Sequence, residues 1–130
     1  MSVDVFVCRF ENGEPAPLDM SAAHEVLGPY VVARDRGTDF LSVSTGDGEE
    51  ADVYLNSPAG ITFNRFGGDG IMDLLAVLLR RLGAVLVVPG GPTVIQRDEE
   101  SEHLPASLRD EWPVVVARTG AEIDHVIRSS

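Results

Sequence analysis

The sequence predicts an α+β domain in which a mostly antiparallel sheet carries helices packed on one face. Three observations predict this fold: segments in which apolar and polar residues alternate, tight turns between them, and a strongly apolar helical pattern over residues 71–82. A ferredoxin-like core with additions is one specific version of it. At 130 residues the chain has the usual length of one domain, so residues 1–130 are expected to form a single unit.

The first quarter of the chain is expected to hold one strand and one helix. Residues 3–10 alternate in the manner of a largely buried strand, and Asn12-Gly13 and the prolines that follow it form a turn. Asp19 is a good N-cap for a short helix through Leu27, which Gly28-Pro29 stops.

Three strands with hairpin connections are expected next, over residues 40–45, 51–55 and 61–66. Gly46-Asp47-Gly48 is a tight turn of the kind that hairpins favour, and residues 56–60 turn the chain again. Because the second and third strands alternate in polarity, one face of the sheet should be covered and the other partly wet.

The helix over residues 71–82 is apolar around most of its circumference, so it should lie deep against the sheet until Gly83 ends it. A buried strand follows over residues 84–88, and the helix and this strand form the second half of a β-α-β unit. Residues 93–95 are expected to extend a strand at the sheet edge. The helix residues expected to be nearly fully buried are Leu74, Leu75 and Leu78.

The last third of the chain begins with an acidic segment, residues 97–103, which is expected to be exposed. Pro105 suits the first turn of a short helix that reaches Glu111. A last strand is predicted over residues 113–117. The run Thr119-Gly120-Ala121-Glu122 matches a capping box and predicts the start of a C-terminal helix.

The charge balance bears on the kind of partner. The chain has 21 acidic and 10 basic residues for a net charge of −11, and every basic residue is arginine. Nucleic acids and anionic membrane surfaces are disfavoured as partners because both attract basic proteins. A basic protein partner would be attracted.

Cys8 is the only cysteine, so an internal disulfide and a cysteine-based zinc site are excluded. We expect Cys8 to be buried and unreactive. The N-terminus lacks the pattern of a signal peptide and the longest apolar run is too short to span a bilayer, which favours the cytoplasm.

Two glycine-rich turns and three histidines are candidate sites. Residues 67–70 precede a helix but lack the P-loop and dinucleotide-binding patterns, and a sharp turn is the favoured interpretation. Pro89-Gly90-Gly91-Pro92 favours a structural corner over a turn that lines a pocket. His24, His103 and His125 have no metal-ligand spacing, so neither a metal nor a cofactor is expected.

Two acidic clusters are the candidate partner-binding residues, and an aromatic anchor would strengthen binding there. Trp112, Tyr54 and Phe66 are the aromatic candidates, although each is expected in the core. The sequence thus favours a non-catalytic protein-binding module, immunity-like or regulatory. The alternative is a small-ligand-binding protein or enzyme with a pocket between sheet and helices near the two glycine-rich turns. The clusters comprise Asp47, Glu49, Glu50 and Asp52, and Asp98, Glu99, Glu100 and Glu102.

Five segments occur along the chain in this order: the run 60–66, the following glycine turn, residues 71–75, Pro89-Gly90-Gly91-Pro92-Thr93 and residues 118–122. Their order resembles that of short uncharacterised actinobacterial proteins. The resemblance covers most of the chain. It implies no activity and no catalytic residue. In size and charge alone the chain is also similar to small acidic immunity proteins that neutralise toxins.

Overall fold

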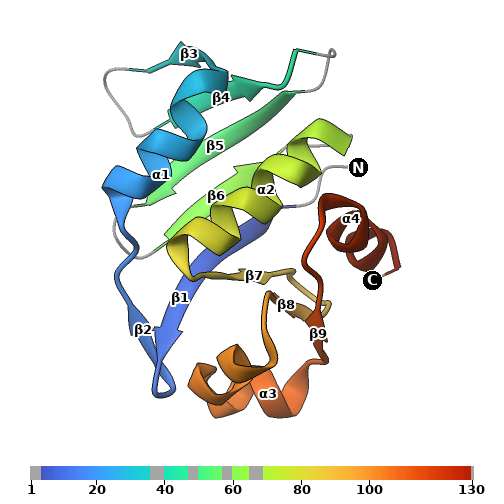
Figure 1. The fold of residues 1–130 in the computed structure, drawn as a ribbon. Helices are drawn as coiled ribbons and strands as arrows, with labels where there is room; N and C mark the ends of the chain where they lie inside the picture. Colours follow the sequence, from blue (N-terminus) through green and yellow to red (C-terminus); the bar gives the residue numbers. More distant parts are fainter. Residues whose placement is uncertain (1–3, 36–39, 47–49, 57–59, 65–68, 130) are drawn as a thin grey trace.

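A computed structural model of the chain describes residues 4–35, 40–46, 50–56, 60–64 and 69–129. Within them the chain forms nine strands, four α-helices and two 3-10 helices (Figure 1). The strands are β1 (Val5–Glu11), β2 (Glu14–Ala16), β3 (Val31–Arg34), β4 (Phe40–Ser44), β5 (Glu50–Asn56), β6 (Gly60–Asn64), β7 (Val85–Val87), β8 (Thr93–Ile95) and β9 (Val114–Val116). The helices are α1 (Met20–Leu27), η1 (Gly28–Tyr30), α2 (Asp69–Leu82), η2 (Asp98–His103), α3 (Ala106–Glu111) and α4 (Gly120–Ser129).

The strands form one sheet in the order β3-β4-β5-β6-β1-β7-β8-β9, and β2 pairs with β1 beside this path. Every pair within the described residues is antiparallel except β8 with β9, which is parallel. The predicted α+β class with a mostly antiparallel sheet is therefore confirmed. The more specific ferredoxin-like core stays a prediction.

The predicted β-α-β unit is present, but a third strand lies between its two strands in the sheet. Both β6 and β7 pair antiparallel with β1, so they run parallel to each other on its two sides. Helix α2 connects them across the face of the sheet (Figure 1). This crossover explains why α2 is so apolar: it packs on the sheet along its length and contacts α1 on one side and α4 on the other.

The main core lies between the sheet and the row of helices α1, α2 and α4. Leu75 and Leu78 are completely buried in it, and Leu74 is 5% exposed, as the sequence predicts. The strands supply alternate residues to this face, such as Val7 of β1 and its partner Leu86 of β7. Gly83 then ends α2 with a φ of 61°, a left-handed conformation that glycine adopts at little cost.

The opposite face of the sheet is open over much of its width and covered at one end. On the open part, Tyr54 is 40% exposed and its ring lies 5.1 Å from that of Phe40. At the β7-β8 end, the segment from η2 to α3 covers a smaller core to which Val85, Ile95 and Leu104 belong. The prediction of helices on one face therefore holds for α1, α2 and α4, whereas η2 and Leu104 cover the other face locally.

Both helix caps predicted from the sequence form. The Asp19 carboxylate accepts a hydrogen bond of 3.1 Å from the Ala22 N–H at the start of α1. At the start of α4, Glu122 N–H donates to Thr119 Oγ1 at 3.1 Å, and Thr119 N–H donates to Glu122 Oε1 at 3.2 Å. This reciprocal pair is the capping box, and it fixes where α4 leaves β9.

Three parts of the fold differ from the sequence expectation. Strands β2 and β3 were not expected: β2 is three residues with a central proline, and three of the four residues of β3 are exposed, so neither has a strong apolar signal. The expectation that residues 93–95 lie at the sheet edge is wrong, because β9 adds outside β8. The acidic segment 97–103 is largely a 3-10 helix. The Gly46-Asp47-Gly48 turn lies mostly outside the described residues.

Candidate functional site

The two acidic clusters expected to bind a partner lie on different elements of the fold. Glu50 is exposed and Asp52 half-buried on β5, whereas the second cluster lies on η2, which follows β8. Strands β6, β1 and β7 separate β5 from β8, a distance of roughly 19 Å at the usual strand spacing. The two clusters therefore do not form one continuous surface. Asp47 and Glu49 lie outside the described residues.

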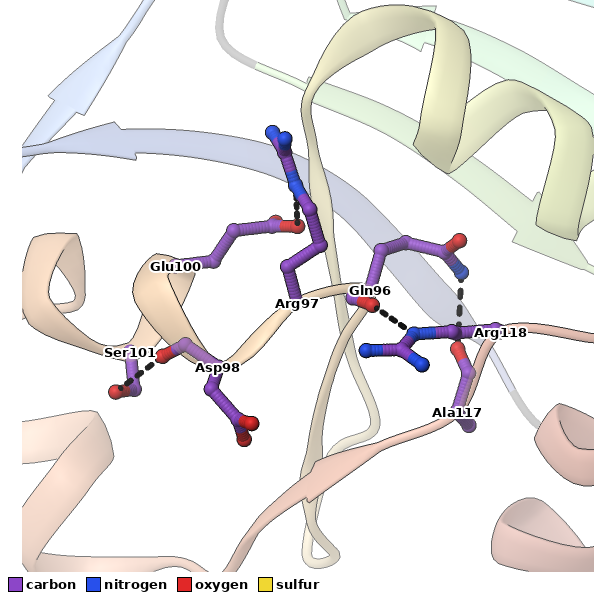
Figure 2. Close-up of polar contacts among 7 residues, drawn as sticks. All are labelled: Gln96, Arg97, Asp98, Glu100, Ser101, Ala117 and Arg118. Carbon is purple, nitrogen blue, oxygen red and sulfur yellow. Dashed lines mark hydrogen bonds and ion pairs between the residues drawn. The ribbon is translucent and has the colours of Figure 1, made fainter.

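Glu100 differs from the other acidic residues of η2. Asp98, Glu99 and Glu102 are exposed, but the Glu100 side chain is only 14% exposed. Its Oε1 lies 3.8 Å from Arg97 Nε (Figure 2), and its Oε2 is buried without a hydrogen-bond partner among the described residues. Burial raises the pKa of this carboxyl, and the charge of Arg97 and nearby backbone N–H groups oppose that rise. Glu100 is thus not part of an exposed acidic surface.

A polar frame joins the end of β8 to the end of β9 beside Glu100 (Figure 2). The buried Gln96 side chain donates from Nε2 to the Ala117 carbonyl oxygen at 2.9 Å, and the Gln96 carbonyl oxygen accepts from Arg118 Nε at 2.9 Å. Arg80 Nη2 reaches the Arg118 carbonyl oxygen at 3.5 Å. These contacts fix the segment between β9 and α4, which the parallel pairing of β8 and β9 also positions.

An apolar groove runs along β9 and α4 on the helix-covered side of the sheet. It consists of two adjoining hollows of about 590 and 360 Å³ that share Val115, His125 and Val126. Trp112 lines the larger hollow and is 40% exposed. Apart from His125, the titratable residues that line the groove are Glu111 and Glu122. We call this feature the β9 groove.

The turn Pro89-Gly90-Gly91-Pro92 forms one end of the β9 groove. Gly90, Gly91 and Pro92 line the larger hollow, so this turn is more than a structural corner. Gly90 has a φ of 73°, which explains the need for glycine there. The expected interpretation as a corner alone therefore missed its contribution to a pocket.

Strand β9 is also an edge of the sheet. Among the described strands it pairs only with β8. The Pro113 carbonyl oxygen accepts a hydrogen bond of 2.9 Å from Thr93 N–H, and the Ala117 N–H donates one of 3.0 Å to the Ile95 carbonyl oxygen, so both groups point to β8. Because backbone groups of a strand alternate in direction, those of Val114 and Val116 point away from the sheet. Such outward N–H and C=O groups can pair with a further strand.

The aromatic candidates from the sequence have separate outcomes. Trp112 was expected in the core, but it stands at the rim of the β9 groove. Tyr54 is equally exposed, on the open face of the sheet, and Phe66 lies outside the described residues. Trp112 follows the exposed residues Asp110 and Glu111 and precedes exposed Pro113, and this polar flank is the sequence signal that could have indicated its exposure.

The remaining candidates have no arrangement that indicates chemistry. Cys8 is half-buried on the face opposite the main core, so the expectation that it is buried is not met in full. Burial raises the pKa of its thiol, and its low reactivity stays a prediction. His103 Nδ1 accepts a hydrogen bond of 3.2 Å from the Asn12 N–H, while His24 and His125 are exposed. In the part of the chain that the structure describes, no group of three or more His, Cys, Asp or Glu residues could hold a metal ion.

No helix in the described ranges is long and apolar enough to cross a membrane. Comparison with known proteins finds no matching family model, no matching curated protein and no matching solved structure. The resemblance to short actinobacterial proteins therefore stays a prediction, and function has to be inferred from the surface itself.

Proposed function

We propose that the chain is a non-catalytic protein-binding module that takes an extended, basic segment of a partner protein along β9. The observation that carries the proposal is Trp112, an exposed aromatic side chain at the rim of the β9 groove, beside the free edge of the sheet. Aromatic residues in such positions commonly dominate the binding energy of protein interfaces.

Edge pairing would supply the backbone contacts. An added strand can hydrogen-bond to the outward N–H and C=O groups of Val114 and Val116 while its alternate side chains enter the adjacent groove. The β9 groove is apolar along Val115 and Val126, which suits an aliphatic or aromatic partner residue. This combination supplies both affinity and register without any catalytic group.

Charge would select a basic partner. Glu111 and Glu122 line the β9 groove, and the exposed acids of η2 lie at the same end of the molecule, because η2 and α3 connect β8 to β9. The net charge of −11 adds a general attraction for basic proteins. Exposed ion pairs contribute only about 0–1 kcal/mol each, so the acids mainly raise the association rate, and the groove supplies the affinity.

Selection from a library of random linear peptides tests the proposal. We expect the enriched peptides to combine lysine or arginine with a large apolar residue. Trp112→Ala should weaken their binding by tenfold or more, which corresponds to about 1.4 kcal/mol. Tyr30→Ala is the matched control, because Tyr30 is 38% exposed next to β3 at the opposite edge of the sheet, and it should leave binding unchanged.

The contribution of charge is tested separately. Asp98→Asn, Glu99→Gln and Glu102→Gln combined should slow association several-fold at low salt, and added salt should remove the difference. Glu100 is left intact in this variant because its side chain is buried. Enriched peptides that are acidic, or that bind the Trp112→Ala protein as well as the wild type, would contradict the proposed function.

A further inference from the structure

A second concave region lies beside Gln96 and Arg118 of the polar frame and shares no lining residue with the β9 groove. It consists of two hollows of about 260 and 370 Å³, which have Gly83, Arg97 and Glu100 in common. Four of the ten arginines of the chain line it. They come from β1, α2 and the segments after β8 and β9, and they are Arg9, Arg80, Arg97 and Arg118. We call this region the arginine cleft.

The sign of charge in the arginine cleft is opposite to that of the whole molecule. Besides the four arginines and His103, the titratable residues that line it are Glu11 and Glu100. Arg9 lies 3.7 Å from Glu11, while the guanidinium groups of Arg80 and Arg118 form no ion pair with a carboxylate among the described residues. In a protein with a net charge of −11, four arginines from four separate segments form a local site suited to an anion.

Part of this positive charge is held in place. The Arg118 side chain is tied at Nε to the Gln96 carbonyl oxygen, and Arg80 reaches across to the Arg118 backbone. A guanidinium fixed through one nitrogen keeps further N–H groups for a ligand, and its planar shape matches two oxygens of one oxyanion. The Arg97 side chain is 71% exposed although its Nε lies 3.8 Å from Glu100 Oε1, so it is accessible to a ligand.

Glu100 adds an unsatisfied acceptor to the same cleft. It lines both hollows, and its buried Oε2 has no hydrogen-bond partner in the described part of the chain. Buried polar atoms are usually paired, so an orphan atom beside a cavity points to a missing donor. The cleft therefore offers hydrogen-bond donors for the oxygens of an anion and one hydrogen-bond acceptor for an O–H group on that anion.

We propose that the arginine cleft binds an oxyanion of the phosphate type that also carries an O–H group. The arginines donate hydrogen bonds to its charged oxygens, and Glu100 accepts a hydrogen bond from its O–H group. Inorganic phosphate near neutral pH meets both conditions, and so does a phosphate ester with a neighbouring hydroxyl. The cleft is at the small end of ligand pockets, which suits a compact anion. This inference is independent of the proposed protein-binding role.

Titration of the full chain with sodium phosphate and with sodium sulfate, followed by amide NMR shifts at constant ionic strength, tests the inference. Sulfate has the same shape but no O–H at neutral pH. We expect saturable phosphate binding with a millimolar or lower Kd, at least tenfold tighter than sulfate. Glu100→Gln should abolish this preference, because an amide can donate to sulfate as well as accept from phosphate.

Charge-matched variants locate the binding. Arg80→Gln combined with Arg97→Gln should weaken phosphate binding at least tenfold. Arg34→Gln combined with Arg109→Gln removes the same charge from exposed positions on β3 and α3, outside the cleft, and should change the Kd less than twofold. A purely structural role, in which the arginines only complement the C-terminal end of α2, predicts no saturable binding. Three outcomes would overturn the inference: no saturable phosphate binding, an equal loss of phosphate affinity in both double variants, or equal affinity of the wild-type protein for sulfate and phosphate.

Discussion

Substitution of Gly120 by alanine should destabilise the protein, although the same change in a helix ordinarily stabilises. Gly120 is buried at the start of α4, where that helix packs on α2. A Cβ atom there would lie 2.6 Å from the backbone nitrogen of Asp73 and 2.8 Å from the carbonyl carbon of Met72. Contacts this short do not occur in real structures, and backbone atoms of α2 cannot rotate away, so α4 would have to shift.

The expected loss follows from how much α4 buries. Overpacking of a close contact costs about 1–3 kcal/mol. Complete detachment of α4 would also expose Ile123, a fully buried residue whose burial contributes about 1.5–3 kcal/mol. Replacement of a helical glycine by alanine otherwise favours the helix by up to about 1 kcal/mol. We therefore expect Gly120→Ala to lower the free energy of unfolding by about 1–3 kcal/mol.

Urea denaturation followed by far-UV circular dichroism and by fluorescence of Trp112 measures this loss. Trp112 is the only tryptophan and lines the β9 groove together with residues of α4, so its emission also reports on that helix. The exposed neighbour Ala121 provides the control, and Ala121→Ser should change stability by less than about 0.5 kcal/mol. If Gly120→Ala leaves stability unchanged or raises it, α4 does not pack closely on α2 at this position.

Three further perturbations have definite expected outcomes. Leu75→Ala should destabilise by about 2–5 kcal/mol in chemical denaturation, because Leu75 is completely buried, and a loss under about 1 kcal/mol would contradict its position. Thr119→Ala removes the cap of α4 and should cost about 0.5–2 kcal/mol in the same assay, whereas Thr119→Ser should retain most of it. Glu100→Gln should stabilise the protein at pH 7 in the same assay, because burial disfavours the charged form of Glu100. Since the pKa of Glu100 is raised in the folded state, ionisation of Glu100 lowers the stability of the wild-type protein as pH rises from about 4.5 through that pKa. The stability gained by Glu100→Gln should therefore vanish near pH 4, where Glu100 is protonated. A gain that does not change with pH would refute this cause.

The sequence was most informative where local patterns and long-range packing agree. The apolar pattern of α2, the Asp19 cap and the Thr119-Glu122 capping box each depend on residues close in sequence, and each forms as predicted. Strand β3 could not be predicted in this way, because its exposed residues have no alternation and only its pairing with β4 makes it a strand. The edge position of β9 likewise depends on a parallel pairing between distant segments.

The candidate sites show the same division. Acidic runs are visible in the sequence, but their separation across the sheet and the burial of Glu100 follow only from the tertiary structure. The four arginines of the arginine cleft are spread from position 9 to position 118, so no local motif could group them. Trp112 has a local signal in its polar neighbours, yet the groove it lines requires α4 and the Pro89–Pro92 turn to meet.

Hydrogen–deuterium exchange of the β9 amides with and without a selected basic peptide tests the proposed strand addition most directly. The N–H groups of Val114 and Val116 point away from the sheet, so in the free protein they should exchange faster than that of Val115, which faces β8. If the peptide pairs with β9, Val114 and Val116 should become protected on binding, while exposed amides of β3 at the opposite edge remain unchanged. Binding that leaves the exchange of Val114 and Val116 as it was in the free protein would contradict the account.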